Sequence, residues 1–243
     1  MNSLISCSIQ IRAMTKRKRS PSKSLPPSLP PSTPPTPQTQ TRHSTNLSKS
    51  RVWIPLNITR QELSLPLTFP TGQTFRWKNT APSQFTGVVG SHLISLKHLQ
   101  NGDVCYTLHS QSSSSTNDCK TALLDFLNAD VSLADTWKVF SDSDERFAEL
   151  AQHLSGARVL RQDPFECLIQ FMCSSNNHIS RITKMVDYVS SLGTYLGCVE
   201  GFDFHAFPTL EQLSLVSEQQ LRNAGFGYRL GLVHSIAIIN NCY

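Results

Sequence analysis

The sequence predicts an α+β fold, in which a half rich in antiparallel strands precedes a half built from helices. From residue 51 to about residue 129, short stretches alternate apolar and polar side chains and are separated by Gly, Pro and Asn turn signals, which is typical of an antiparallel meander. Beyond Asp130 the apolar residues recur every three or four positions, as in helices. The 243 residues suffice for one large domain or two small ones. We expect a tail at 1–50, a sheet domain at 51–155 and a helical domain at 156–243.

The tail is predicted to be disordered, because eight prolines between Pro21 and Pro37 are interleaved with Ser and Thr and leave little apolar surface to bury. Its basic cluster Lys16–Arg19 favours a nuclear localisation signal, and a merely solubilising tail is the alternative. Residues 1–13 lack acidic side chains and could instead direct the chain to an organelle. We expect a nuclear protein.

The positive charge of the chain lies in this tail. Residues 1–51 hold nine of the 22 Lys and Arg and none of the 17 acidic residues, so the remainder carries 13 basic against 17 acidic residues. The basic balance is therefore no sign that the folded part binds nucleic acid. A DNA-binding surface there has to be a local cluster.

The seven cysteines are odd in number and form no Cys-x-x-Cys pair, which argues against a disulfide framework and a zinc site. Cys167 and Cys173 fall in an apolar helical run and are expected to be small buried residues. No apolar run approaches the roughly 20 residues that span a bilayer. We expect a soluble protein in a reducing compartment, without a membrane, metal or cofactor.

The expected strands lie at 52–56, 63–67, 74–77, 87–89, 92–96 and 104–108. An exposed serine-rich loop at 111–117 and a helix at 118–128 that packs on the sheet follow them. In the helical half, helices are expected at 132–140, 144–154, 163–173 and 177–192. Two capping boxes, at Thr209–Gln212 and Ser217–Gln220, each open a short helix.

The most informative stretch runs from Arg158 to Ile182. Asp163-Pro164 marks a helix start, and the apolar run that follows breaks at the corner 174–178, Ser-Ser-Asn-Asn-His, after which a second helix carries Arg181 early. A corner rich in amides contributes little to packing, so its side chains are expected to contact something outside the protein. On spacing alone the alternative is equally good: a helix–helix loop whose asparagines cap the second helix.

Four segments resemble the eukaryotic 8-oxoguanine DNA glycosylases of the helix-hairpin-helix glycosylase superfamily, and the plant enzymes look most similar. They are PTGQTFRW at 70–77, LLDFLNADVSLADTW at 123–137, ARVLRQDPFECLIQFMCSSNNHISRITKMVDYVSSLG at 157–193 and AGFGYR at 224–229. The resemblance covers about Trp53 to about Val233. It implies a sheet domain like half of a TATA-binding-protein fold, followed by the first part of an all-α helix-hairpin-helix glycosylase domain.

Such enzymes flip an oxidised guanine out of the duplex, because its glycosidic bond cannot be reached inside the stack. By resemblance, the backbone carbonyl of Gly72 accepts the N7 hydrogen that only 8-oxoguanine carries; the alternative is a simple turn glycine. Asn176 fills the space left by the flipped base, and Tyr228 is the aromatic wedge beside the lesion. Arg181 and Arg229 hydrogen-bond the orphaned cytosine. The implied partner is double-stranded DNA with oxidised guanine opposite cytosine, bound by a monomer.

Two positions depart from the family pattern: His178 stands where the corner usually has a third asparagine, and Ser180 precedes Arg181. The family's Schiff-base chemistry needs an amine nucleophile, and the resemblance puts the catalytic lysine and aspartate beyond Tyr243. Lys184 is expected to be solvated. We therefore expect no catalytic residue here, a truncated product without its closing helices, an exposed apolar face and marginal stability.

Three hypotheses for the function follow. The first is a bifunctional base-excision enzyme, a DNA glycosylase and lyase for oxidised purines. The second is a catalytically silent DNA-binding fragment, and the third is a non-enzymatic module that uses the sheet domain for protein contacts only. Gly72 together with the corner favours the first two, and the absence of the family's lysine favours the second. We expect the glycosylase lineage without activity in this polypeptide.

Overall fold

The computed structural model describes residues 52–109 and 116–229, which belong to one compact unit of the chain. The expected disordered tail with its localisation signal and most of the serine-rich loop lie outside the described residues. Within these two ranges, no helix has the length and apolar character needed to cross a membrane. The same ranges contain no group of three His, Cys, Asp or Glu side chains placed to hold a metal ion.

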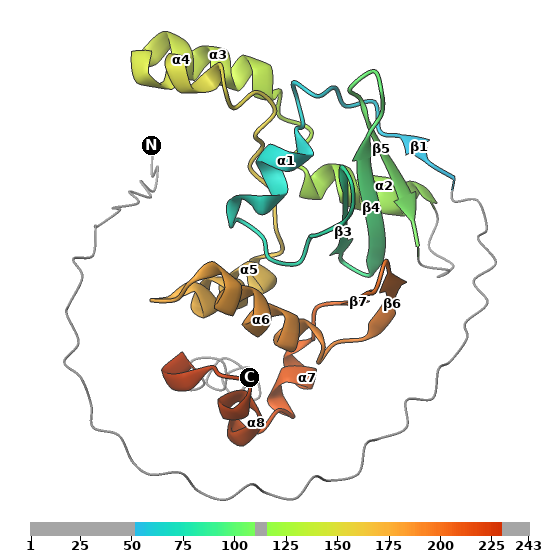
Figure 1. The fold of residues 1–243 in the computed structure, drawn as a ribbon, viewed down its shortest axis with the longest axis vertical. Coiled ribbons are helices and arrows are strands. Elements are labelled where there is room, and N and C mark those ends of the chain that lie inside the picture. Colours follow the sequence, from blue (N-terminus) through green and yellow to red (C-terminus); the bar gives the residue numbers. More distant parts are fainter. Residues whose placement is uncertain (1–51, 110–115, 230–243) are drawn as a thin grey trace, which may run out of the picture. The chain divides into compact units, whose positions relative to one another are not determined.

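An antiparallel sheet dominates the first half of the described chain, and it confirms the predicted α+β class (Figure 1). Its five strands in the described residues lie in the order β1-β5-β4-β3-β2. They are β1 (Ile54–Pro55), β2 (Lys78–Ala81), β3 (Gln84–Val89), β4 (His92–His98) and β5 (Val104–Leu108). Strands β2 to β5 form the expected meander, and β1 pairs with β5 at the other edge.

The expected strand at 63–67 is wrong, because the short helix α1 (Leu65–Thr68) occupies this place. The alternation of apolar and polar residues suggested a strand with one exposed face, yet Leu63, Ser64 and Leu65 are all buried. Pro66 lies in the first turn of the helix, where its fixed φ and missing N–H favour helix formation.

The expected strand at 74–77 is also wrong, since β2 begins only at Lys78. In this stretch the N–H of Phe75 donates to Oε1 of Gln170 at 3.0 Å, and not to a carbonyl of a neighbouring strand. Trp77 stacks between Phe69 and Phe126, with ring centroids 4.3 and 5.7 Å away. This stretch is therefore shaped by contacts with distant side chains.

The helix α2 (Thr116–Phe126) packs on the sheet, as predicted. Its Leu123 and Phe126 lie in one buried cluster with Ile94, Leu96 and Val104 of the strands. This cluster is the core of the first half.

The helical half follows the prediction closely. Its helices are α3 (Leu133–Ser143), α4 (Glu145–Ala151), α5 (Pro164–Ser174), α6 (Ile179–Ser190), α7 (Leu210–Ser214) and α8 (Glu218–Asn223). Asp163 caps α5 by accepting the N–H of Glu166 at 2.9 Å. Both capping boxes, at Thr209 and Ser217, form with their reciprocal hydrogen bonds.

A hairpin inside the helical half is absent from the prediction. Strands β6 (Tyr195–Val199) and β7 (Phe202–His205) pair antiparallel, and Val199 and Phe204 form a small buried cluster with Val88 and Leu93 of the sheet. Burial against strands that lie a hundred residues earlier in the chain decides this conformation, so local sequence carries little sign of it.

One cysteine assignment is wrong. Cys173 is buried as expected, and burial raises the pKa of its thiol to about 11, but Cys167 is exposed. Cys167 lies on the outer face of α5 beside Leu168, and Phe171 on this helix is 68 % exposed. Exposed apolar side chains also mark α3 and α4, at Val139, Phe140 and Leu150. Exposed apolar side chains are thus present on three helices, while a single exposed apolar face and the expected marginal stability stay predictions.

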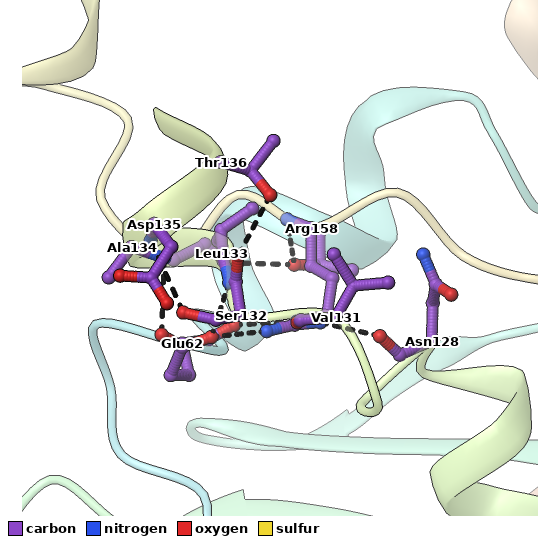
Figure 2. Close-up of polar contacts among 11 residues, drawn as sticks. Glu62, Asn128, Val131, Ser132, Leu133, Ala134, Asp135, Thr136 and Arg158 are labelled. Carbon is purple, nitrogen blue, oxygen red and sulfur yellow. Dashed lines mark hydrogen bonds and ion pairs between the residues drawn. The ribbon is translucent and has the colours of Figure 1, made fainter. Parts of the chain in front are cut away.

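A buried arginine ties the start of α3 to the sheet half. Arg158 is only 4 % exposed, and its guanidinium pairs with the Glu62 carboxylate and donates to the carbonyls of Glu62, Asn128 and Val131 at 2.7–2.9 Å (Figure 2). The same carboxylate accepts two N–H groups of the first turn of α3, at 2.8 and 3.2 Å. Burial lowers the pKa of Arg158 and the charge of Glu62 opposes this. The charged form of Arg158 therefore depends on the Glu62 carboxylate and on the carbonyls that accept its hydrogen bonds.

Arg158→Met is expected to lower the free energy of unfolding by about 3–5 kcal/mol, because it leaves a carboxylate and several buried carbonyls without their donor. Urea denaturation followed by circular dichroism measures this change. Arg161→Met is the matched control, since Arg161 forms its ion pairs with Asp125 and Asp130 at the surface and its loss should cost far less. Equal losses of unfolding free energy in the two variants would contradict the assignment of Arg158 as the arginine that stabilises this part of the fold.

Candidate nucleic-acid interface

The Pro-Thr-Gly-Gln segment forms a tight turn that ends in Gly72. The 3₁₀ turn η1 (Phe69–Thr71) leads into Gly72, whose φ of 84° and ψ of 7° lie in the left-handed region that favours glycine. Space is not the reason for the glycine, because an added β-carbon would meet only the Ile179 side chain, at 3.9 Å. The turn therefore lies beside the first residue of α6, and Gly72 is exposed there.

The corner between α5 and α6 presents Asn176 at its tip. Asn176 is exposed and has a left-handed φ of 45°, and its side chain makes no hydrogen bond within the described ranges. Asn177 instead holds the corner together: its Nδ2 donates to the carbonyl of Cys173 at 2.9 Å, and its Oδ1 accepts the N–H of His178 at 3.0 Å. His178 is the N-cap residue of α6 and forms no side-chain cap. Neither asparagine is that N-cap residue.

Tyr228 and Arg229 reach the same corner from the segment after α8. They lie in the 3₁₀ turn η2 (Gly227–Arg229), and the Tyr228 hydroxyl donates to the carbonyl of Ser175 at 3.1 Å while its ring stays 65 % exposed. The Arg229 guanidinium, 4.5 Å from the centre of the Tyr228 ring, donates to the carbonyls of Ser175 and Asn176. Arg229 is thereby buried.

Arg181 completes this group. It is exposed on the first turn of α6, and its Nη2 donates to the carbonyl of Gly225 at 2.7 Å. Among the described residues, neither Arg181 nor Arg229 forms an ion pair with a carboxylate. The structure thus brings Asn176, Arg181, Tyr228 and Arg229 together from two segments, and within residues 52–109 and 116–229 the two positive charges have no acidic partner.

Lysines contribute little to this surface. Lys184 is exposed on α6, as expected, and Lys78 is engaged with Asp187 at 2.7 Å. Two residues that support the site were not predicted from the sequence. These are Asn177, which fixes the corner, and Gln73, whose amide ties the turn to the segment around residue 160. The amide-rich composition of both segments is the only local sign of these roles.

Comparison with known proteins places these features in a family. The sequence pattern of the 8-oxoguanine DNA glycosylase N-terminal domain matches residues 55–168. The chain is 60 % identical over 191 residues to the N-glycosylase/DNA lyase OGG1 of Arabidopsis thaliana, covering 78 % of this chain and 51 % of that protein. It is 35 % identical over 184 residues to the N-glycosylase/DNA lyase of Saccharomyces cerevisiae, covering 72 % and 48 %. The chain therefore spans about half the length of the curated relatives it matches.

Solved structures show the same fold. MBOgg1 in complex with a low-affinity DNA ligand superposes with a TM-score of 0.68 at 22 % identity, covering 79 % of this chain and 64 % of that one. The 8-oxoguanine glycosylase/lyase of Clostridium acetobutylicum, bound to double-stranded DNA with cytosine opposite 8-oxoG, gives 0.66 at 24 % identity, covering 77 % and 62 %. The fold of this chain is thus shared with these solved structures, and the chain belongs to the 8-oxoguanine DNA glycosylase family, with a plant-like sequence.

Proposed function

We propose that this chain recognises duplex DNA with 8-oxoguanine opposite cytosine, as the lesion-recognising part of a base-excision repair glycosylase/lyase. The observation that carries the proposal is the convergence of Asn176, Arg181, Tyr228 and Arg229 around one exposed corner. The Clostridium relative was solved on such a duplex. Two arginines without acidic partners suit a polyanion even though the described part of the chain is not basic overall.

Each group has a separate task in this proposal. The exposed ring of Tyr228 enters the base stack beside the lesion and replaces part of the lost stacking. The unengaged amide of Asn176 fills the space that the flipped base leaves. Arg181 and Arg229 supply planar donor forks to O2 and N3 of the orphaned cytosine.

The Gly72 carbonyl distinguishes the damaged base in this proposal. In 8-oxoguanine N7 carries a hydrogen, whereas in guanine it is a bare acceptor. A carbonyl that faces N7 therefore gains a hydrogen bond with the lesion and meets a lone pair with the normal base. The exposed left-handed turn presents the backbone of Gly72 without a side chain in the way.

The second candidate is a DNA-binding chain without chemistry of its own. The specific observation in its favour is the surface position of Lys184 and the ion pair of Lys78, since neither is a desolvated amine beside the turn. We propose that residues 1–243 alone bind the lesion and do not form a Schiff base with the sugar.

Delivery to the nucleus through Lys16–Arg19 is a further proposal from the sequence. Imaging of a tagged chain in which this cluster is neutralised tests it.

Tyr228→Ala is expected to weaken binding to an 8-oxoG:C duplex about 5- to 150-fold, because stacking of one base on an aromatic ring contributes roughly 1–3 kcal/mol. Asn176→Ala should weaken it in the same direction. Fluorescence anisotropy with the full 243-residue chain measures both. Tyr228→Phe keeps the ring, and Tyr195→Ala removes an exposed tyrosine of β6, so both should bind as the unaltered chain does. Unchanged affinity in the Tyr228→Ala and Asn176→Ala variants would refute the proposal.

Trapping with sodium borohydride tests the chemistry. A Schiff base between an amine and the sugar would be reduced to a stable covalent complex, visible as a retarded band. We expect no band when residues 1–243 meet an 8-oxoG:C duplex. A clear band would show that an amine within this chain is the nucleophile, and the second candidate would then be excluded.

The two arginines should differ in their effect on stability. Arg229→Ala leaves the carbonyls of the corner without a buried donor and is expected to cost about 1–3 kcal/mol of unfolding free energy as well as DNA affinity. Arg181→Ala removes an exposed side chain, so it should change stability little and weaken binding more when the lesion lies opposite cytosine than opposite adenine. Thermal denaturation and anisotropy with both duplexes measure this. Equal losses of stability in the two variants would contradict the assignment of a structural role to Arg229 alone.

A further inference from the structure

The side-chain amide of Gln73 forms hydrogen bonds through both its nitrogen and its oxygen. Its Nε2 donates to the carbonyls of Thr68 and Arg158, each at 3.0 Å, and its Oε1 accepts the N–H of Leu160, also at 3.0 Å. Bonding to the C=O of one residue and the N–H of the residue two positions later is what the main chain of a residue does in a parallel pair of strands. The Gln73 amide thus imitates a strand residue, and its donor and acceptor groups are engaged.

The main chain of Gln73 is anchored to the same segment. Nε2 of Gln162 donates to the carbonyl of Gln73. Gln73 is therefore attached to residues 158, 160 and 162 through both its side chain and its backbone, directly after Gly72. Two residues further on, the N–H of Phe75 is held by Gln170.

The segment that receives these bonds is itself fixed. Arg158 carries the buried guanidinium described above, and its N–H donates to the Thr68 hydroxyl at 3.3 Å, which in turn donates to the carbonyl of Gly156 at 3.3 Å. Gly156 packs so closely that an added β-carbon would lie 2.3 Å from the carbonyl of Arg60. The turn is thus attached to one of the most constrained parts of the chain.

This support bears directly on lesion recognition. Glycine has the most pliable backbone of all residues, so an unsupported Gly72 carbonyl could rotate away from the lone pair of guanine N7 and avoid the repulsion. A carbonyl that is held in place cannot rotate away. It therefore attracts N7 of 8-oxoguanine and repels N7 of guanine, and the difference in binding free energy is preserved. We infer that Gln73 is a positioning residue that holds the Gly72 carbonyl toward N7 and thereby sets the preference for 8-oxoguanine over guanine. The inference rests on the proposed role of Gly72.

The test compares Gln73→Glu and Gln73→Met in the full 243-residue chain. Glutamate keeps the size but turns an oxygen toward two carbonyls, whereas methionine keeps the volume and loses every bond. By anisotropy, each variant should bind an 8-oxoG:C duplex at least fivefold more weakly and a G:C duplex within twofold of the unaltered chain. In hydrogen exchange, the amide of Leu160 should lose its protection in the Gln73→Met variant, because methionine offers its N–H no oxygen acceptor.

Two further variants separate positioning from general stability. Thr86→Val removes buried hydroxyl bonds to Thr80 and Ser95 inside the sheet, so it should destabilise the chain and leave the ratio of the two affinities unchanged. Gln162→Leu removes only the anchor on the Gln73 carbonyl and should lower the ratio by a smaller factor. It keeps the inference testable if the Gln73 variants fail to fold.

The outcomes distinguish this inference from the proposed function. A Gln73 variant, or Gln162→Leu, that keeps the original affinity ratio overturns the inference and leaves lesion recognition intact. An unchanged rate of exchange at Leu160 in the Gln73→Met variant overturns it as well. If the unaltered chain does not prefer the lesion duplex, the proposed function fails, and the inference is overturned with it.

Discussion

A guanidinium taken out of water has to be surrounded by acceptors, and those of Arg158 come from separate stretches of this chain. Glu62 lies between β1 and α1, whereas Asn128 and Val131 lie between α2 and α3. The arginine therefore fixes where the chain leaves the sheet half and where α3 begins. It also fixes residues 158–162, to which the Gly72 turn is attached through Gln73. A buried contact that is not itself part of the proposed DNA surface thus helps to position one of its elements.

The sequence alone predicted the elements whose conformation depends on neighbouring residues. It failed for elements whose conformation depends on contacts with residues far away in the chain. The capping boxes at Thr209 and Ser217 and the turn at Gly72 depend on neighbouring residues, and all were found as expected. The strand at 63–67 and the hairpin β6–β7 were misjudged or missed, because burial from several sides or against the sheet overrides the local pattern. The family motifs named the groups at the corner, but no local pattern indicated that Gln73 and Asn177 would support them.

The corner also shows how the unbound protein holds the exposed Arg181 and the buried Arg229, neither of which has an acidic partner among the described residues. Arg229 donates to the carbonyls of Ser175 and Asn176, and Arg181 to that of Gly225. A carbonyl carries a partial negative charge and accepts a bond without neutralising the cation, so the positive potential for a polyanion is retained. An aspartate in the same place would hold the side chain as well, but it would repel phosphate.

These backbone carbonyls have a further consequence for cytosine recognition. Carbonyl oxygens resemble O2 of cytosine as acceptors, so in the proposed complex the arginines would exchange one set of acceptors for a similar set as they engage the orphaned base. The net gain is then small, because the bonds in the unbound protein are lost as those in the complex form. Discrimination comes instead from the opposite base: a base that presents a donor at these positions leaves a buried guanidinium N–H unpaired, and that penalty is large. On the proposed function, pairing in the unbound state therefore lowers affinity for every duplex while it leaves the selection for cytosine in place.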